Sequence, residues 1–286
     1  MPQIDQVESV FRSAVRDNFV YQRVRFQRVL VLTDLDADKA AAFGADCRAF
    51  LSSGGGDDSA EWRTLRGDEF IGIDGMLGQI EQQRPDLICT YRNLHSRAWR
   101  YPHSLGMYLD VLLQDIDTPV LVMPHPEADY AAEHALRDRD TVMVVTDHLS
   151  GQHQLVNHGA ALTEAGGTLI LSHIEDERIF ARYIEAIGKI DTIDTDNARE
   201  RLRHQLLKEP SNYIESCIAQ LAAAGVDLSV EALVTFGRHL PEYKSLIQSR
   251  HIDLLVMNAK DDDQLAMHGL AYPLAVELRQ IPLLVL

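Results

Sequence analysis

The stretch "LLVMNAKDDDQLAMHGLAYPLAVELRQIPLLVL", residues 254–286, decides the fold class of this chain. It contains an apolar run, a polar loop, an amphipathic helix and a second apolar run. Neither run alternates apolar with polar residues, which is typical of strands that are buried on both faces of a parallel sheet. The stretch therefore predicts a strand–helix–strand unit of an α/β protein.

Similar apolar runs recur along the chain, with helix-like segments such as 151–166 and 212–225 between them. This alternation predicts parallel sheets whose strands are joined by right-handed crossovers. The clearest further runs lie at 28–34, 86–92, 118–124, 141–147, 167–174 and 229–235.

The chain also contains an internal repeat, in which three blocks of the first half match three blocks of the second half in the same order. The pairs are "RVLVLTDLD" (28–36) with "TVMVVTDHL" (141–149), "RPDLICTYRN" (84–93) with "HIDLLVMNAK" (251–260), and "HSLGMYLDVLLQDIDTPVLVM" (103–123) with "MHGLAYPLAVELRQIPLLVL" (267–286). The repeat predicts two homologous domains, 1–130 and 138–286, with the boundary in a polar segment near 125–140.

The two predicted domains are unequal, because the first lacks the residues for one strand–helix unit. We expect residues 1–26 to cover the surface that the missing unit would have buried.

The second half resembles a universal stress protein domain, and the whole chain resembles a tandem universal stress protein. The resemblance rests on the strand that ends at Asp147, the following helix and strand "LVNHGAALTEAGGTLILSHI", the strand "DLLVMNA", the helix after Gly269 and the final "IPLLVL". It implies two Rossmann-like domains of the adenine nucleotide alpha hydrolase-like fold. Each would hold a parallel five-stranded sheet of order 3-2-1-4-5 flanked by helices.

In the nucleotide-binding branch of that family, the penultimate strand leads into the pattern G-x2-G-x9-G-S/T. Its glycines let backbone N–H groups approach the phosphates. On this chain the pattern falls on Asn258, near Asp261, and on Gly269, so one glycine of three remains. A carboxylate ~4 Å from a phosphate costs about 1–4 kcal/mol. The acidic run Asp261–Asp263 is therefore expected to disfavour a triphosphate, unless a divalent metal bridges the charges. Otherwise it is a solvated loop before a helix.

The matching loop of the first half, "YRNLHSRAWRYPHSLG" (91–106), has the opposite charge. Ser104 is expected to cap a helix that begins near Leu105, with Gly106 at its start. A helix N-terminus beside guanidinium groups predicts an anion site, and any phosphate or nucleotide is expected here. The alternative is a surface loop whose arginines pair with the chain's own carboxylates. The basic candidates are Arg92, Arg97, Arg100 and His103.

Two aspartates, Asp34 and Asp147, end the first strand of each repeat. Ligands of open α/β sheets bind at that edge of the sheet. The resemblance implies a place near the base or ribose of a nucleotide. The alternative is a turn or helix-capping role.

Composition limits the classes of partner. The formal net charge is −16 and the pI about 5.1, which argues against nucleic acid and anionic membranes. The sequence contains no apolar run of the roughly 18 residues that span a bilayer, and its start reads as an amphipathic segment. Three widely separated cysteines argue against a disulfide framework and predict the reducing cytoplasm.

The resemblance implies a stress-response module, and the residues predict that it binds or regulates without catalysis and without ATP. The alternative is a nucleotide-binding switch or weak ATPase that uses the Arg-rich loop. No residue set is placed for catalysis or for a metal, and no cofactor is expected. The resemblance implies self-association through the last strands, 118–124 and 281–286. That pairing would form a pseudo-dimer within the chain or a homodimer.

Overall fold

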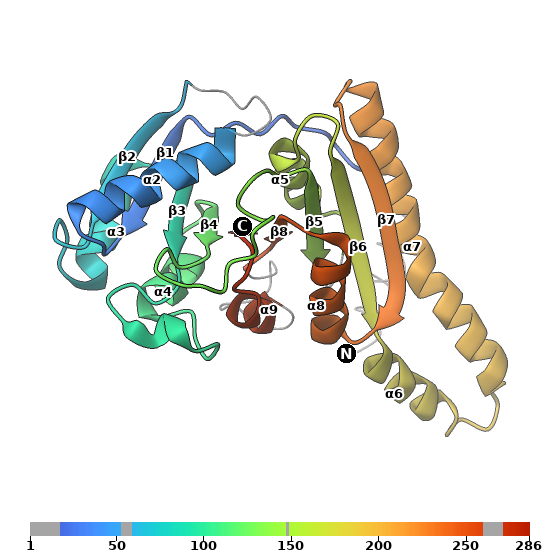
Figure 1. Ribbon diagram of the computed structural model, residues 1–286. Coiled ribbons are helices and arrows are strands. Elements are labelled where there is room, and N and C mark those ends of the chain that lie inside the picture. Colours follow the sequence, from blue (N-terminus) through green and yellow to red (C-terminus); the bar gives the residue numbers. More distant parts are fainter. Residues whose placement is uncertain (1–17, 53–58, 147–148, 260–270) are drawn as a thin grey trace.

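The computed structural model describes residues 18–52, 59–146, 149–259 and 271–286. The described residues form an α/β fold with one nine-stranded, mostly parallel sheet (Figure 1). The strand order is β2-β1-β3-β4-β9-β8-β5-β6-β7. The single antiparallel pair joins β4 to β9, which divides the sheet into a first and a second half.

The first half contains four strands among the described residues. They are β1 (Arg28–Thr33), β2 (Glu61–Arg66), β3 (Leu87–Tyr91) and β4 (Val120–Met123). The helical elements around them are α2 (Ala37–Ser52), α3 (Gly72–Gln83), the short 3-10 helix η1 (Arg97–Arg100) and α4 (Met107–Asp115). The stretch 67–86, between β2 and β3, holds only α3 and has no room for a fifth strand with its helix. This part of the sheet is therefore four-stranded and not five-stranded.

The second half contains five strands, which are β5 (Thr141–Thr146), β6 (Thr168–Asp176), β7 (Ser229–Gly237), β8 (Leu254–Met257) and β9 (Leu283–Val285). Across the sheet these strands follow the order third, second, first, fourth, fifth. Its helices are α5 (His153–Leu162), α6 (Glu177–Ile187), α7 (Thr195–Ala223), α8 (His239–Arg250) and α9 (Ala271–Glu277). The long helix α7 runs beside β7 at the edge of the sheet (Figure 1).

The seam between the halves is the antiparallel pair β4–β9, in which Leu121 lies opposite Leu284. Both strands are buried, and β4 also pairs with β3 while β9 pairs with β8. The strands therefore use both of their edges inside the chain. One continuous hydrophobic core extends through both halves as a result.

The segment between β4 and β5 crosses the seam without helix or strand. Arg139 is buried in this segment and donates from Nε to the carbonyl of Leu162, 2.9 Å away, and from Nη1 to the carbonyl of Phe50. One guanidinium thereby ties the segment to helix α2 of the first half and to helix α5 of the second.

The N-terminal segment does not lie where the sequence suggested. Phe19 is buried against the second half, with its ring 6.1 Å from His153 and 6.4 Å from Tyr213. Asn157 of α5 accepts from the backbone N–H of Gln22 and donates to the carbonyl of Val20. The expectation that this segment covers the missing unit is wrong for residues 18–26, because they bind α5 and α7 instead. Residues 1–17 lie outside the described part of the chain.

In the part of the chain that the structure describes, no helix is both long enough and apolar enough to cross a membrane.

Candidate functional site

The carboxyl ends of β1, β3 and β4 form the candidate site of the first half. Asp34 follows β1, and its carboxylate accepts hydrogen bonds from the hydroxyl of Tyr91 and, at 2.7 Å, from the backbone N–H of His95. The Tyr91 hydroxyl also lies 2.7 Å from Thr33 Oγ1 and accepts from the Asp34 backbone N–H. Asp34 therefore ties the end of β1 to the loop after β3.

The Tyr91 phenol stays neutral in this arrangement. Burial raises its pKa above the ordinary value, and the neighbouring carboxylate of Asp34 raises it further. A neutral phenol keeps the proton that it donates to Asp34. It therefore acts as a fixed donor and not as a base.

His125, just after β4, completes the wall of the site. Its ring stacks on Trp99 with centroids 4.2 Å apart and meets the edge of Tyr91 at 4.7 Å. Its Nδ1 accepts from the backbone N–H of Glu127, which assigns the remaining proton to Nε2. Burial lowers the pKa of His125 to about 4 despite the nearby Asp34. The imidazole is thus neutral at physiological pH.

The loop between β3 and α4 covers the N-terminus of that helix. The Asn93 N–H donates to the Leu105 carbonyl at 2.7 Å, and the Ser104 hydroxyl donates to Asn93 Oδ1 at 3.1 Å. A Cβ atom on Gly106 would lie 2.6 Å from the Asn93 Cα, and Gly106 has a φ of 89°. Only glycine permits this approach.

The expected helix start is corrected by this geometry. Helix α4 begins at Met107 and not near Leu105, and its capping position is Gly106. Ser104 is not the helix cap, because its hydroxyl is directed to Asn93. The cause is the tight contact between Asn93 and Gly106, which delays the first helical turn.

The basic residues of the loop do not converge. Arg97, Arg100 and His103 are exposed, and neither arginine forms an ion pair with any described carboxylate. The Arg100 guanidinium lies over the Trp99 ring at 5.3 Å. Arg92 points the other way and is 1% exposed, with its guanidinium on the carbonyls of Ala275 and Leu278. The loop therefore does not gather its arginines around one anion at the N-terminus of α4.

In the second half, the structure describes one of the three predicted residues. Asn258 follows β8, and its Nδ2 donates to Gln152 Oε1, 2.9 Å away at the start of α5. Asp147, Gly269 and the acidic run 261–263 lie outside the described residues.

A cleft that the sequence reasoning missed opens at the carboxyl ends of β6 and β7. It measures about 590 Å³ and lies between the first turns of α6 and α8. Its lining combines apolar side chains with side chains of both charges. The basic residues are Arg178 and Arg238, and the acidic residues are Glu175 and Asp176. These residues come from two separate strand–helix turns, so no local motif indicated them.

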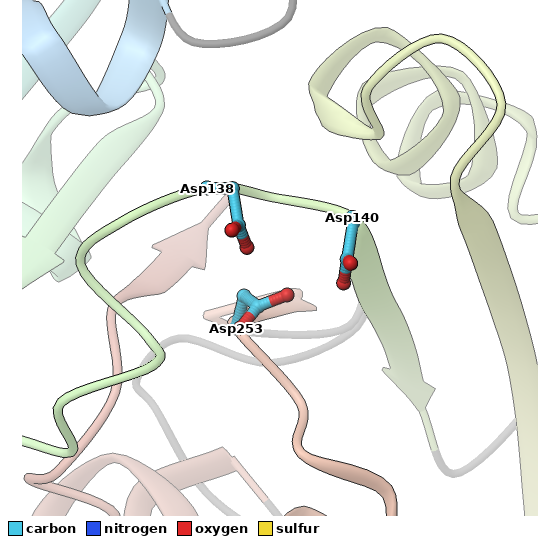
Figure 2. Close-up of side chains that lie close together, drawn as sticks. All are labelled: Asp138, Asp140 and Asp253. Atoms are coloured by element: carbon cyan, nitrogen blue, oxygen red, sulfur yellow. The ribbon is translucent and has the colours of Figure 1, made fainter.

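A second missed cluster lies at the opposite, amino edge of the sheet. The carboxylates of Asp138, Asp140 and Asp253 point toward one another, with oxygen atoms within 4.8 Å (Figure 2). Asp253 Oδ2 accepts from the Thr141 N–H at 3.0 Å. Burial raises the pKa of Asp253 to about 8, and the neighbouring Asp140 and Asp138 raise it too. Asp253 therefore carries a proton at neutral pH.

The fold and the carboxyl edge of the sheet define a class of protein. It has an open, mostly parallel α/β sheet with candidate binding positions at the carboxyl ends of its strands. Residues 138–268 match the Universal stress protein family. This match lies in the half for which the sequence resemblance is fullest, and it does not extend into the first half.

No curated protein matches the chain. Several solved structures are similar over 91% of its length. One is a functionally unknown protein from Pseudomonas aeruginosa PAO1, with 13% identity and a TM-score of 0.47, and the match covers 92% of that protein's chain. Another is a universal stress protein from Archaeoglobus fulgidus DSM 4304, with 12% identity and a TM-score of 0.48, and the match covers 97% of that protein's chain.

Proposed function

We propose that the chain is a tandem of two universal-stress-protein-like domains, 1–130 and 138–286, that acts in stress responses as a non-catalytic binding or regulatory module. In this proposal the chain does not bind ATP through the family's glycine loop. The self-association that the family resemblance implies is then internal, through β4 and β9 of the same chain.

The strand order supports the tandem arrangement. Read outward from the seam, each half presents its last, penultimate, first and second strand in the same sequence. Among the described residues, only the second half continues with a further strand, β7. This symmetry about an antiparallel pair is what two homologous domains produce when they pair like an isologous dimer.

One observation carries the proposal that ATP does not bind in the first half, and it is the covered N-terminus of α4. In the second half, the proposal rests on the acidic run Asp261–Asp263, which stands in the sequence where the family has glycine. A phosphate at that position would displace Asn93, which is held by its bonds to Leu105 and Ser104. Each such hydrogen bond contributes about 0.5–1.5 kcal/mol net. Because Asn93 packs closely against Gly106, it cannot move aside by a small shift toward this glycine.

Ligands of a different kind have room in the second half. The cleft beside α6 and α8 is open, and its lining holds apolar side chains together with Arg178, Arg238, Glu175 and Asp176. We infer that it suits a small ligand with both polar and apolar groups better than a triphosphate. A binding role at that edge does not require a set of catalytic residues.

Equilibrium dialysis of the purified chain against labelled ATP with Mg²⁺ tests this proposal. We expect no saturable binding at millimolar ATP and no release of phosphate above the rate without protein. Nucleotide that copurifies with the chain, or binding in the micromolar range, would overturn it.

A double variant, Arg97→Ala with Arg100→Ala, locates the site if ATP does bind. Loss of binding in this variant supports the alternative of a nucleotide switch in the first half. Unchanged binding places the nucleotide elsewhere and still excludes the proposal. The matched control is Arg199→Ala, an exposed arginine of α7.

A further inference from the structure

Arg92 is a buried cation at the seam between the two halves. Its Nε and Nη2 donate to the carbonyls of Ala275 and Leu278, both at 2.8 Å, at the end of α9. Its third nitrogen, Nη1, is buried and has no hydrogen-bond partner among the described residues. Buried polar groups are almost always paired, so this nitrogen requires an acceptor that the described chain does not provide.

Two more unpartnered polar atoms belong to the neighbours of Arg92. The Arg279 guanidinium lies over the Tyr130 ring at 4.4 Å and donates from Nη1 to the Trp99 carbonyl at 3.0 Å. Arg279 Nε and the Tyr130 hydroxyl are also buried without a partner among the described residues. Three buried hydrogen-bond donors from three separate segments are thus left without an acceptor among the described residues. Tyr130 and Arg279 both lie close enough to Arg92 to affect its pKa.

The charge at this seam is unbalanced. Burial lowers the pKa of Arg92 to about 10; the nearby Tyr130 opposes this shift, and the like charge of Arg279 adds to it. Neither arginine forms an ion pair with a described carboxylate, although the chain has 43 acidic and 27 basic residues. Two carbonyls at the end of α9 offset only part of this charge. A buried cation of this kind needs a negative partner.

We propose that Arg92, Tyr130 and Arg279 bind a compact inorganic anion at the seam and that this anion fastens the two halves of the sheet together. Guanidinium and phenol groups donate hydrogen bonds, and an anion supplies only acceptors, so their chemistries match. The segments that it connects are the end of β3, the chain between β4 and β5, and the end of α9. The inference does not rest on the proposed function, because it involves neither ATP nor the family match.

Such a site explains why Arg92 turns away from the loop 91–106. The end of α9 and the neighbouring arginine form only when both halves are assembled. An anion therefore binds the assembled chain and not the unfolded one, and it raises stability as its concentration rises.

Bromide is the direct probe of this site, because its anomalous scattering distinguishes it from water. We expect crystals grown in sodium bromide to show a bromide peak in contact with Arg92 Nη1, Arg279 Nε and the Tyr130 hydroxyl. A water molecule in that place, with no bromide peak, would overturn the proposal.

Thermal unfolding provides the test in solution. We expect chloride to raise the melting temperature more than gluconate does at the same ionic strength, since gluconate is too bulky for a buried seam. The same increase with both salts would show a general ionic effect and overturn the proposal.

Two variants assign that effect to the site. Tyr130→Phe removes one oxygen atom and Arg279→Gln removes one charge, and we expect each to raise the apparent dissociation constant for chloride about tenfold. Arg199→Gln, in exposed α7, is the matched control and keeps the chloride effect. Circular dichroism confirms that the variants fold. If Tyr130→Phe and Arg279→Gln respond to chloride like the control, the proposed site is wrong.

Discussion

The two edges of the sheet treat their carboxylates in opposite ways. At the carboxyl edge, Asp34 faces donors, since the Tyr91 hydroxyl and the His95 N–H both bond to it. At the amino edge, Asp253 faces two further carboxylates and is 2% exposed, and it keeps a proton because burial and its neighbours raise its pKa to about 8. The difference teaches that the surrounding donors, and not the residue type, decide how an aspartate is used.

The comparison also implies opposite sensitivities to pH. The carboxyl edge contains a buried neutral imidazole, so protonation at low pH destabilises the fold there. The amino edge contains a buried neutral carboxyl group, so deprotonation at high pH destabilises the fold there. The following changes test this contrast, from the largest expected effect to the smallest.

The largest effect is expected from Asp253→Asn at high pH. The folded-state pKa of Asp253 is raised to about 8 from an unfolded value of 3.8. Its contribution to the free energy of unfolding is therefore complete below pH 3.8 and is lost as the pH rises through 8. The Asn variant lacks this loss, because its amide does not ionise. We expect it to exceed wild type in free energy of unfolding by about 3 kcal/mol at pH 9, with little difference at pH 4. Denaturant unfolding at both pH values measures this, and parallel pH profiles would show that Asp253 does not carry a proton at neutral pH.

His125→Gln tests the opposite edge. Burial lowers the folded-state pKa of His125 to about 4, below the unfolded value of 6.5. Its contribution is therefore present above pH 6.5 and is lost as the pH falls through 4. We expect wild type to lose about 2 kcal/mol more than the variant between pH 7 and pH 4. The same unfolding series measures this loss. An equal loss in both proteins would show that His125 is not buried as a neutral ring.

Tyr91→Phe removes the donor that holds Asp34. The change leaves the Asp34 carboxylate and Thr33 Oγ1 without this partner in a buried site. We expect a loss of about 2 kcal/mol in the free energy of unfolding at pH 7. Tyr21→Phe, a partly buried tyrosine of the N-terminal segment, is the matched control. A loss no greater than that of the control would mean that the carboxyl edge does not depend on this hydrogen bond.

The smallest effect on stability is expected from Arg97→Ala combined with Arg100→Ala. Both side chains are exposed and form no ion pair with a described residue. We expect a change within about 0.5 kcal/mol, measured by thermal unfolding. A larger loss would show that the loop 91–106 contributes to folding and is not only a surface.

Much of the fold was predictable because strand formation depends on local sequence. The β-branched apolar runs became strands, and the polar segment near 125–140 contains neither helix nor strand. The place of Asp34 at a strand end followed from the same runs. The start of α4 was not predictable, because the contact between Asn93 and Gly106 delays it and depends on how the loop folds back.

The sequence by itself determined the order of strands and helices and the match between its two halves, since both follow from hydrophobic patterns within short windows. Tertiary structure alone decided the roles of single polar residues. Arg92 bonds to carbonyls 183 and 186 residues away, and Asp253 meets Asp140 only because β5 and β8 are neighbours in the sheet. A charged side chain takes its partners and its pKa from whatever packs around it. That environment is assembled from segments that lie far apart in the sequence.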